Sequence, residues 1–195
     1  MLFISACLFA ISANLDTLVV GLSYGFKKIR ISLFQNVLIA AIALIFTAVS
    51  IYLGKTIIHF IPENLPKILG SSLLILIGIW SIIKGVMYKK RMIKSGDIYS
   101  NPEKYDEDKS GFLDTKESIF LGLALTINNF ALGIGIGMVG INILLTLVLT
   151  VCGSLGFIYI GGLAGKRYRP KRLEKYAGII SSAMIILLGI YEIIG

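Results

Sequence analysis

Six apolar runs, each long enough to cross a bilayer as a helix, take up most of this 195-residue chain. A transmembrane helix needs about 20 apolar residues, because the hydrocarbon core is ~30 Å thick and each helical residue rises ~1.5 Å. Hydrophobic residues make up 56% of the sequence and charged residues 15%, proportions that exclude an ordinary soluble domain. We therefore predict an all-α integral membrane protein with six transmembrane helices, at Leu2–Phe26, Ile31–Gly54, Leu69–Tyr88, Ile119–Val139, Ile143–Gly165 and Leu173–Ile194.

Basic residues are distributed unevenly among the connections between these runs. The first, third and fifth connections with their edges hold 17 of the 19 Lys and Arg residues, whereas the second holds 2 and the fourth none. Because cytoplasmic loops are enriched in Lys and Arg, this predicts a multi-pass cell membrane protein with both termini outside and the long central loop in the cytoplasm. The net charge of +8 comes from these connections, and it predicts contact with the lipid bilayer rather than with nucleic acid.

The sequence contains no nucleotide-binding loop, catalytic triad or thiolate metal site. Cys7 and Cys152 both fall within apolar runs, where we expect buried free thiols rather than a disulfide. We therefore expect neither an enzyme nor an organic cofactor, and the sequence identifies no protein partner.

A carboxylate stands in the middle of the first apolar run. Asp16 is flanked by Asn14 and Thr17, and a carboxylate at bilayer depth costs roughly 2.5–3.5 kcal/mol on insertion scales. This cost favours an ion or proton site, with a structural hydrogen bond as the alternative. Gly21 and Gly25 form a pair of small residues one turn apart, which would let another helix approach closely and turn the polar cluster toward protein.

The fourth run repeats the pattern of the first. Aligning Asn128 with Asp16 matches Gly133 and Gly137 to the two glycines of the first run, and it pairs Thr126 with Asn14. Three helices per half place the second half upside down, as in the inverted repeats of secondary transporters. Both polar clusters would lie roughly 14–15 Å from the cytoplasmic face. We therefore predict one transport site from two repeats, residues 1–88 and 119–195, formed by Asn14, Asp16, Thr17, Thr126, Asn128 and Asn129.

The central loop, residues 89–118, contains a pattern typical of an EF-hand calcium loop over residues 106–117. Gly111 occupies position 6, where the sharp turn needs it, and an oxygen donor is available at each ligand position. The predicted calcium ligands are Asp106, Asp108, Ser110, the Phe112 carbonyl, Asp114 and Glu117. The alternative is a solvated acidic linker. A metal bound here would adjoin the fourth helix, which carries the second polar cluster.

Taken together, these motifs resemble the manganese efflux pump (MntP) family, and more closely its sporulation membrane protein (YtaF) branch. The resemblance includes Asn14-x-Asp16-x4-Gly21 in the first run, Asn128-x4-Gly133 in the fourth and the Gly161–Lys166 end of the fifth. It implies a six-helix exporter fold of two inverted repeats, with an acidic site between helices 1 and 4 for Mn²⁺ or a similar cation. The family has an Asp at the position of Asn128 and an acidic residue where Ala43 and Leu44 fall, so only Asp16 is retained as an acid.

Two functions therefore remain open. The first is a secondary exporter of a divalent cation that uses Asp16, with manganese as one substrate. The second is a non-transporting sporulation membrane protein of the same fold, which senses metal through its loop or scaffolds partners. Because a hard divalent cation prefers several anionic oxygens, the loss of acids from helices 2 and 4 predicts weaker binding and favours the second function. Retention of Asp16 favours the first.

Overall fold

The computed structural model describes residues 2–62, 65–88, 110–167 and 171–194, and these form six helices. They are α1 (Leu2–Phe26), α2 (Leu33–Ile58), α3 (Pro66–Tyr88), α4 (Thr115–Val139), α5 (Ile143–Gly165) and α6 (Lys171–Ile194). No strand occurs among the described residues; Arg30 and Phe112 form an isolated bridge. Five helices are long and apolar enough to span a membrane singly, and α4 is the sixth if its two halves count as one span. This confirms the all-α membrane class.

Four helices begin at other residues than the sequence predicted. α3 begins at Pro66 rather than Leu69, and α6 begins at Lys171 rather than Leu173. α2 begins at Leu33 rather than Ile31, because the side chain of Ser32 caps it by accepting the Gln35 N–H at 3.4 Å. α4 begins at Thr115 rather than Ile119, because Asp114 and Glu117 form a capping box in which the Glu117 carboxylate accepts the Asp114 N–H at 2.9 Å. The last residues of the expected loop 89–118 are therefore helical.

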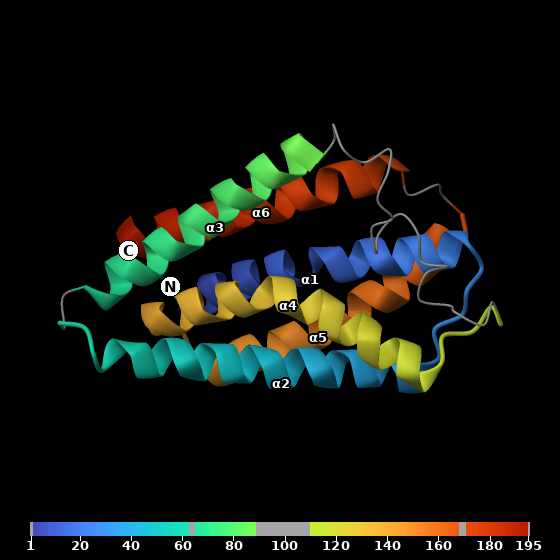
Figure 1. Ribbon diagram of the computed structural model, residues 1–195, viewed down its shortest axis with the longest axis horizontal. Coiled ribbons are helices and arrows are strands. Elements are labelled where there is room, and N and C mark those ends of the chain that lie inside the picture. Colours follow the sequence, from blue (N-terminus) through green and yellow to red (C-terminus); the bar gives the residue numbers. More distant parts are fainter. Residues whose placement is uncertain (1, 63–64, 89–109, 168–170, 195) are drawn as a thin grey trace.

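The helices pack in three main pairs: α1 with α5, α2 with α4, and α3 with α6. Further contacts join α1 to α6, α3 to α4 and α2 to α5, and α1 meets α4 over a short stretch. Figure 1 shows α3 and α6 side by side along one edge of an elongated bundle. Large apolar side chains such as Leu33, Trp80 and Leu144 point outward, as expected for a surface in contact with lipid. Cys152 is also exposed on α5 and Cys7 is half-buried, so the prediction of two buried thiols is wrong for Cys152.

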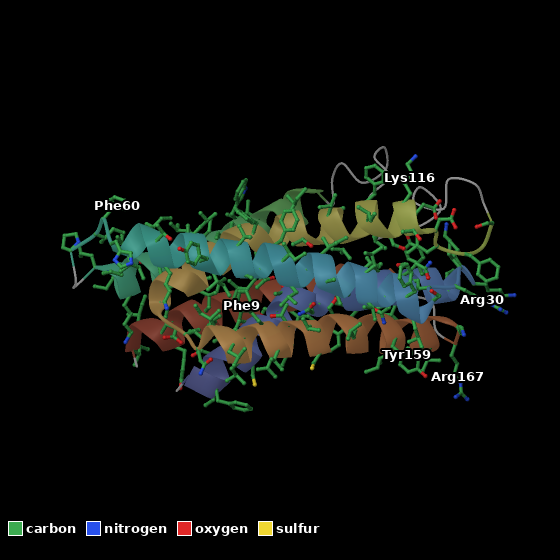
Figure 2. The ribbon with its side chains drawn as sticks, turned by 90° about the horizontal axis from the view of Figure 1, so that it is seen from below. Phe9, Arg30, Phe60, Lys116, Tyr159 and Arg167 are labelled. Atoms are coloured by element: carbon green, nitrogen blue, oxygen red, sulfur yellow. The ribbon has the colours of Figure 1, made fainter. Side chains whose placement is uncertain are left out.

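Basic side chains gather at one end of the bundle. Figure 2 shows Arg30, Lys116 and Arg167 at this end and Phe60 at the opposite end. We call the first the basic end: it contains the α1–α2 connection, the start of α4 and the end of α5. The other, the far end, contains the α2–α3 and α4–α5 connections, and both termini lie toward it in Figure 1.

Two buried apolar clusters fill the interior, one toward each end. The basic-end cluster consists of Val20, Tyr24, Ile29, Ile39, Leu113, Leu121, Leu125 and Ile158. The far-end cluster consists of Ala6, Phe9, Ala13, Ile51, Leu74, Leu132, Ile136, Ile141, Ile185 and Leu188. Each helix that contributes to both clusters changes from one to the other near its middle.

Candidate ion-binding site

The polar residues of α1 and α4 lie between the two apolar clusters. On α1, Asp16 and Thr17 fall between Ala13 of the far-end cluster and Val20 of the basic-end cluster. On α4, Asn128 and Asn129 fall between Leu125 and Leu132 in the same way. We call this level of the bundle the polar layer. It is separated from both ends by buried hydrocarbon.

The Asp16 carboxylate is held from within its own helix. Its Oδ1 accepts the Thr17 N–H at 2.7 Å and the Thr17 hydroxyl at 3.3 Å. Its Oδ2 is buried and has no hydrogen-bond partner among the described residues. A buried carboxylate oxygen without a partner is costly, because the water that it gave up is not replaced. Asp16 therefore keeps a strong acceptor available inside the bundle.

Asn129 joins α4 to α1 one turn from Asp16. Its Nδ2 donates to the Ala13 carbonyl oxygen at 2.6 Å. In a regular helix that carbonyl accepts the Thr17 N–H, and Thr17 N–H here donates to the Asp16 side chain. The Ala13 carbonyl and the Thr17 N–H, which bond to each other in a regular helix, thus each have a side-chain partner at the polar layer. α4 also departs from regularity there, since Thr115–Ile127 and Asn129–Val139 meet at 49°.

The other predicted site residues lie on different faces. Asn14 donates from Nδ2 to the Ala10 carbonyl at 2.8 Å and to the Thr150 carbonyl of α5 at 3.3 Å. Thr126 donates to the Gly122 carbonyl at 2.5 Å, and Gly122 packs against α2. The structure therefore brings Asp16, Thr17 and Asn129 to one region and turns Asn14 toward α5. The side chain of Asn128 lies outside the description, so contact between Asp16 and either asparagine stays a prediction.

One buried amide was missed by the sequence reasoning. Asn36 of α2 is 5% exposed, and its Nδ2 donates to the Leu155 carbonyl of α5 at 3.1 Å. Its Oδ1 is buried without a partner among the described residues. A polar residue in the first turn of a membrane helix usually lies at the headgroups, and no signal in the sequence distinguished Asn36 from such a residue.

The described half of the predicted calcium loop is shaped by hydrogen bonds within the chain. Gly111 has a φ of +77°, which favours glycine. The Phe112 carbonyl accepts the Ser110 hydroxyl at 2.9 Å, and Glu117 and Asp114 form the capping box of α4. Asp106 and Asp108 lie outside the described residues. Within the described ranges no group of three or more His, Cys, Asp or Glu side chains could hold a metal ion, so the calcium ligand set stays a prediction.

A bundle of membrane-length helices with a carboxylate in a polar layer, closed at both ends by apolar clusters, is the architecture of a multi-pass transport protein. The chain matches the family described as "Putative manganese efflux pump" over residues 1–82 and 88–193, and it belongs to that family. The resemblance drawn from the motifs is thereby confirmed.

Two relatives match over nearly their whole length. The "Probable sporulation protein YtaF" of Bacillus subtilis (strain 168) is 26% identical over 212 residues, which covers 99% of this chain and 100% of the relative. The "Putative manganese efflux pump MntP" of Methanobrevibacter smithii is 28% identical over 204 residues, which covers 98% and 97%. No solved structure matches the chain significantly.

Proposed function

We propose that this protein exports a divalent cation, with Mn²⁺ as the first substrate to test, and that Asp16 supplies the carboxylate that binds it. The single observation that supports this most is the Asp16 Oδ2 atom, which is buried between two apolar clusters without a partner among the described residues. Membership in a family described as manganese efflux pumps supports the same substrate.

Oxygen donors near Asp16 fit a hard cation. Mn²⁺ and similar ions accept carboxylate, carbonyl and hydroxyl oxygens, and the polar layer offers Asp16, the Thr17 hydroxyl and the amide oxygen of Asn129. One carboxylate gives less charge compensation than several would. The expected site is therefore weaker than one with additional acids, a property that also allows rapid release.

An inverted repeat is the second part of the proposal, and the glycine contacts of the helix pairs support it. Adding 112 to a residue of α1 gives its expected counterpart in α4, and adding 111 relates α2 to α5. A Cβ at Gly25 would collide with Gly162, and a Cβ at Gly137 would collide with Ile51. Gly137 is the expected counterpart of Gly25, and Gly162 is the expected counterpart of Ile51. The α1–α5 and α2–α4 crossings therefore have equivalent contacts.

The α3–α6 pair gives independent support. A Cβ at Gly78 would lie 2.6 Å from Ile186 Cγ1 and 3.0 Å from the Ser182 carbonyl. A Cβ at Gly189 would lie 2.7 Å from Ile75 Cγ1 and 2.8 Å from the Ser71 carbonyl. An offset of 111 relates Gly78 to Gly189, Ile75 to Ile186 and Ser71 to Ser182, so the two sets of contacts are equivalent. Such reciprocal contacts are expected where a two-fold axis passes between α3 and α6.

Alternating access through the polar layer follows from this arrangement. Two apolar clusters, one on each side of the layer, can serve as two barriers that open in turn. The excess of Lys and Arg in the connections of the basic end favours a cytoplasmic position for that end. Export would then load Asp16 from the basic end and release the ion toward the far end.

Transport into inside-out proteoliposomes tests the proposal. We expect Asp16→Asn to lower the initial rate of Mn²⁺ uptake at least tenfold, because it removes the charge and keeps the size of the side chain. Glu192→Gln is the matched control, since Glu192 is also a carboxylate within a membrane helix but accepts a hydrogen bond from Ser5 away from the polar layer. Equal rates in the wild type, Asp16→Asn and protein-free vesicles would exclude Mn²⁺ transport.

A non-transporting role in sporulation is the second candidate, and the name of the Bacillus subtilis relative favours it. In this case Asp16 would be a structural group, and Asp16→Asn would change stability but not ion flux. Calcium binding by residues 106–117 fits either role, and we keep it as a proposal. Glu117→Gln is a suitable probe, because Gln also completes a capping box and so leaves the start of α4 intact.

A further inference from the structure

We propose that Leu113, with the segment Ser110–Asp114 around it, is the gate on the basic side of the polar layer, and that Arg30 latches this gate closed. The inference rests on the proposed transport function and assigns a residue-level barrier to it.

Backbone pairing fixes the segment against the α1–α2 connection. The Arg30 N–H donates to the Gly111 carbonyl at 2.9 Å, and the Leu113 N–H donates to the Arg30 carbonyl at 3.0 Å. The Arg30 guanidinium carbon also lies 5.7 Å from the centroid of the Phe112 ring, within cation–π range. Arg30 thus contacts three consecutive residues with its backbone and its side chain. This set of contacts is the latch.

Leu113 is the side chain that the latch inserts into the bundle. It is 2% exposed and belongs to the basic-end cluster. The other members come from α1, α2, α4 and α5 and from the α1–α2 connection. Leu113 is the one member of this cluster that lies in the segment between the central loop and the start of α4. It therefore closes the space among four helices from the basic end.

The cluster adjoins the polar layer directly. Val20 lies one helical turn from Asp16, and Leu125 lies one turn from Asn129. An ion that moves between the basic end and Asp16 through this space must pass the position of Leu113. Because a bare or hydrated cation is excluded from a packed apolar region, the cluster has to open first.

Leu113 is the member most easily withdrawn. The helices of the cluster interlock through close backbone contacts; a Cβ at Gly21, for example, would lie 2.7 Å from the Ile158 carbonyl oxygen of α5. The segment Ser110–Asp114 is instead anchored at its last residue by the cap of α4, and two backbone hydrogen bonds and one ring contact bind it to Arg30. Gly111 has a φ of +77° and no atom within 4 Å of its Cβ position, so it can serve as the hinge.

A reversible crosslink tests whether the latch must open. Arg30 and Phe112 are bridge partners, and neighbouring strands lie ~4.8 Å apart, within the range for a disulfide. In a Cys7→Ala/Cys152→Ala background we expect oxidised Arg30→Cys/Phe112→Cys to transport Mn²⁺ at least tenfold more slowly than the reduced form, with full recovery in reductant. Each single cysteine variant, oxidised in the same way, is the control. An oxidised double variant that transports as fast as its reduced form would overturn the gate.

A labelling experiment decides the same question without transport. Thr126→Cys, in the cysteine-free background, places a thiol at a buried position of α4 beside the polar layer. We expect Leu113→Ala to raise its reaction rate with a charged, membrane-impermeant methanethiosulfonate at least tenfold, only from the basic end. Phe120→Ala, which truncates an exposed apolar side chain of α4, is the control and should not change the rate.

The two results separate the gate from the proposed function. Absence of Mn²⁺ transport in the wild type would exclude the transport function, and faster labelling in Leu113→Ala would still establish the barrier. Equal labelling rates in Leu113→Ala, Phe120→Ala and the parent would exclude Leu113 as the barrier, whatever the transport result.

Discussion

At the scale of single residues, the difference between Asp16 and Asn128 is the one that bears most on ion affinity. Asn128→Asp would place a second carboxylate at the expected two-fold counterpart of Asp16. Because a hard divalent cation binds more tightly as anionic ligands are added, we expect the Kd for Mn²⁺ to fall at least tenfold. Binding to purified protein in detergent measures this. Asn142→Asp adds the same charge at an exposed residue of the far end and is the control.

The opposite result would also be informative. An unchanged Kd in Asn128→Asp would mean that the residue 128 side chain does not reach the ion bound by Asp16. Asn14 already illustrates this kind of separation. It lies two residues before Asp16, which places it about 200° around the helix, and its amide bonds to α5. The sequence predicted Asn14 and Asp16 at one level of α1, and helical geometry alone could have separated their faces.

At the scale of the elements, glycine pairs set how closely the helices approach. Gly78→Ala and Gly189→Ala should lower the melting temperature by similar amounts, because their contacts are the same under the proposed repeat. Each added Cβ meets a packed Ile side chain and a carbonyl, and overpacking of this kind costs about 1–3 kcal/mol. Thermal unfolding in detergent is the measurement. Gly178→Ala is the control, since no atom lies within 4 Å of its Cβ position.

Unequal losses in the two variants would argue against a two-fold relation between α3 and α6. The small-residue pattern of α1 and α4 predicted close helix approach, and this is what the structure has. The pattern did not identify the partner helix, because Gly21 and Gly25 can pack against any helix with an accessible backbone. Their partner is α5 rather than α4, and this choice depends on packing over the whole bundle.

The start of α4 links the helix to the loop and gives a prediction about calcium. If residues 106–117 bind the ion, calorimetry should record heat at millimolar Ca²⁺ with the wild type, and Glu117→Gln should abolish it, because the position-12 ligand loses its bidentate charge. The expected affinity is no tighter than ~10⁻⁶ M, since no second EF-hand pattern exists to pair with this one. Heat that persists in Glu117→Gln would place the ion elsewhere.

The capping box also explains why the sequence placed this boundary four residues late. Asp114 and Glu117 have the spacing of both an EF-hand ligand pair and a helix N-terminus. This spacing alone does not distinguish a pair of metal ligands from the N-terminus of a helix. The apolar runs predicted six helices, with boundaries where hydrophobicity changes. In the structure, α2 and α4 begin instead directly after their capping residues, Ser32 and Asp114.

At the scale of the whole molecule, orientation decides in which direction an ion would move. The basic end contains Arg30, Lys116 and Arg167, and Phe60 lies exposed at the far end (Figure 2). Two single-cysteine variants in a Cys7→Ala/Cys152→Ala background can locate both ends. We expect an impermeant maleimide added to intact cells to label Phe60→Cys and to leave Ser95→Cys unlabelled, because Ser95 belongs to the lysine-rich central loop.

Each variant serves as the control for the other, and permeabilising the cells should make Ser95→Cys reactive. Labelling of Ser95→Cys in intact cells, with protection of Phe60→Cys, would reverse the orientation. The gate at Leu113 would then face the outside, so the same latch would control release rather than loading. The direction of transport and the position of the latch thus depend on one measurable property, the orientation in the membrane, which the positions of 17 of the 19 basic residues predict.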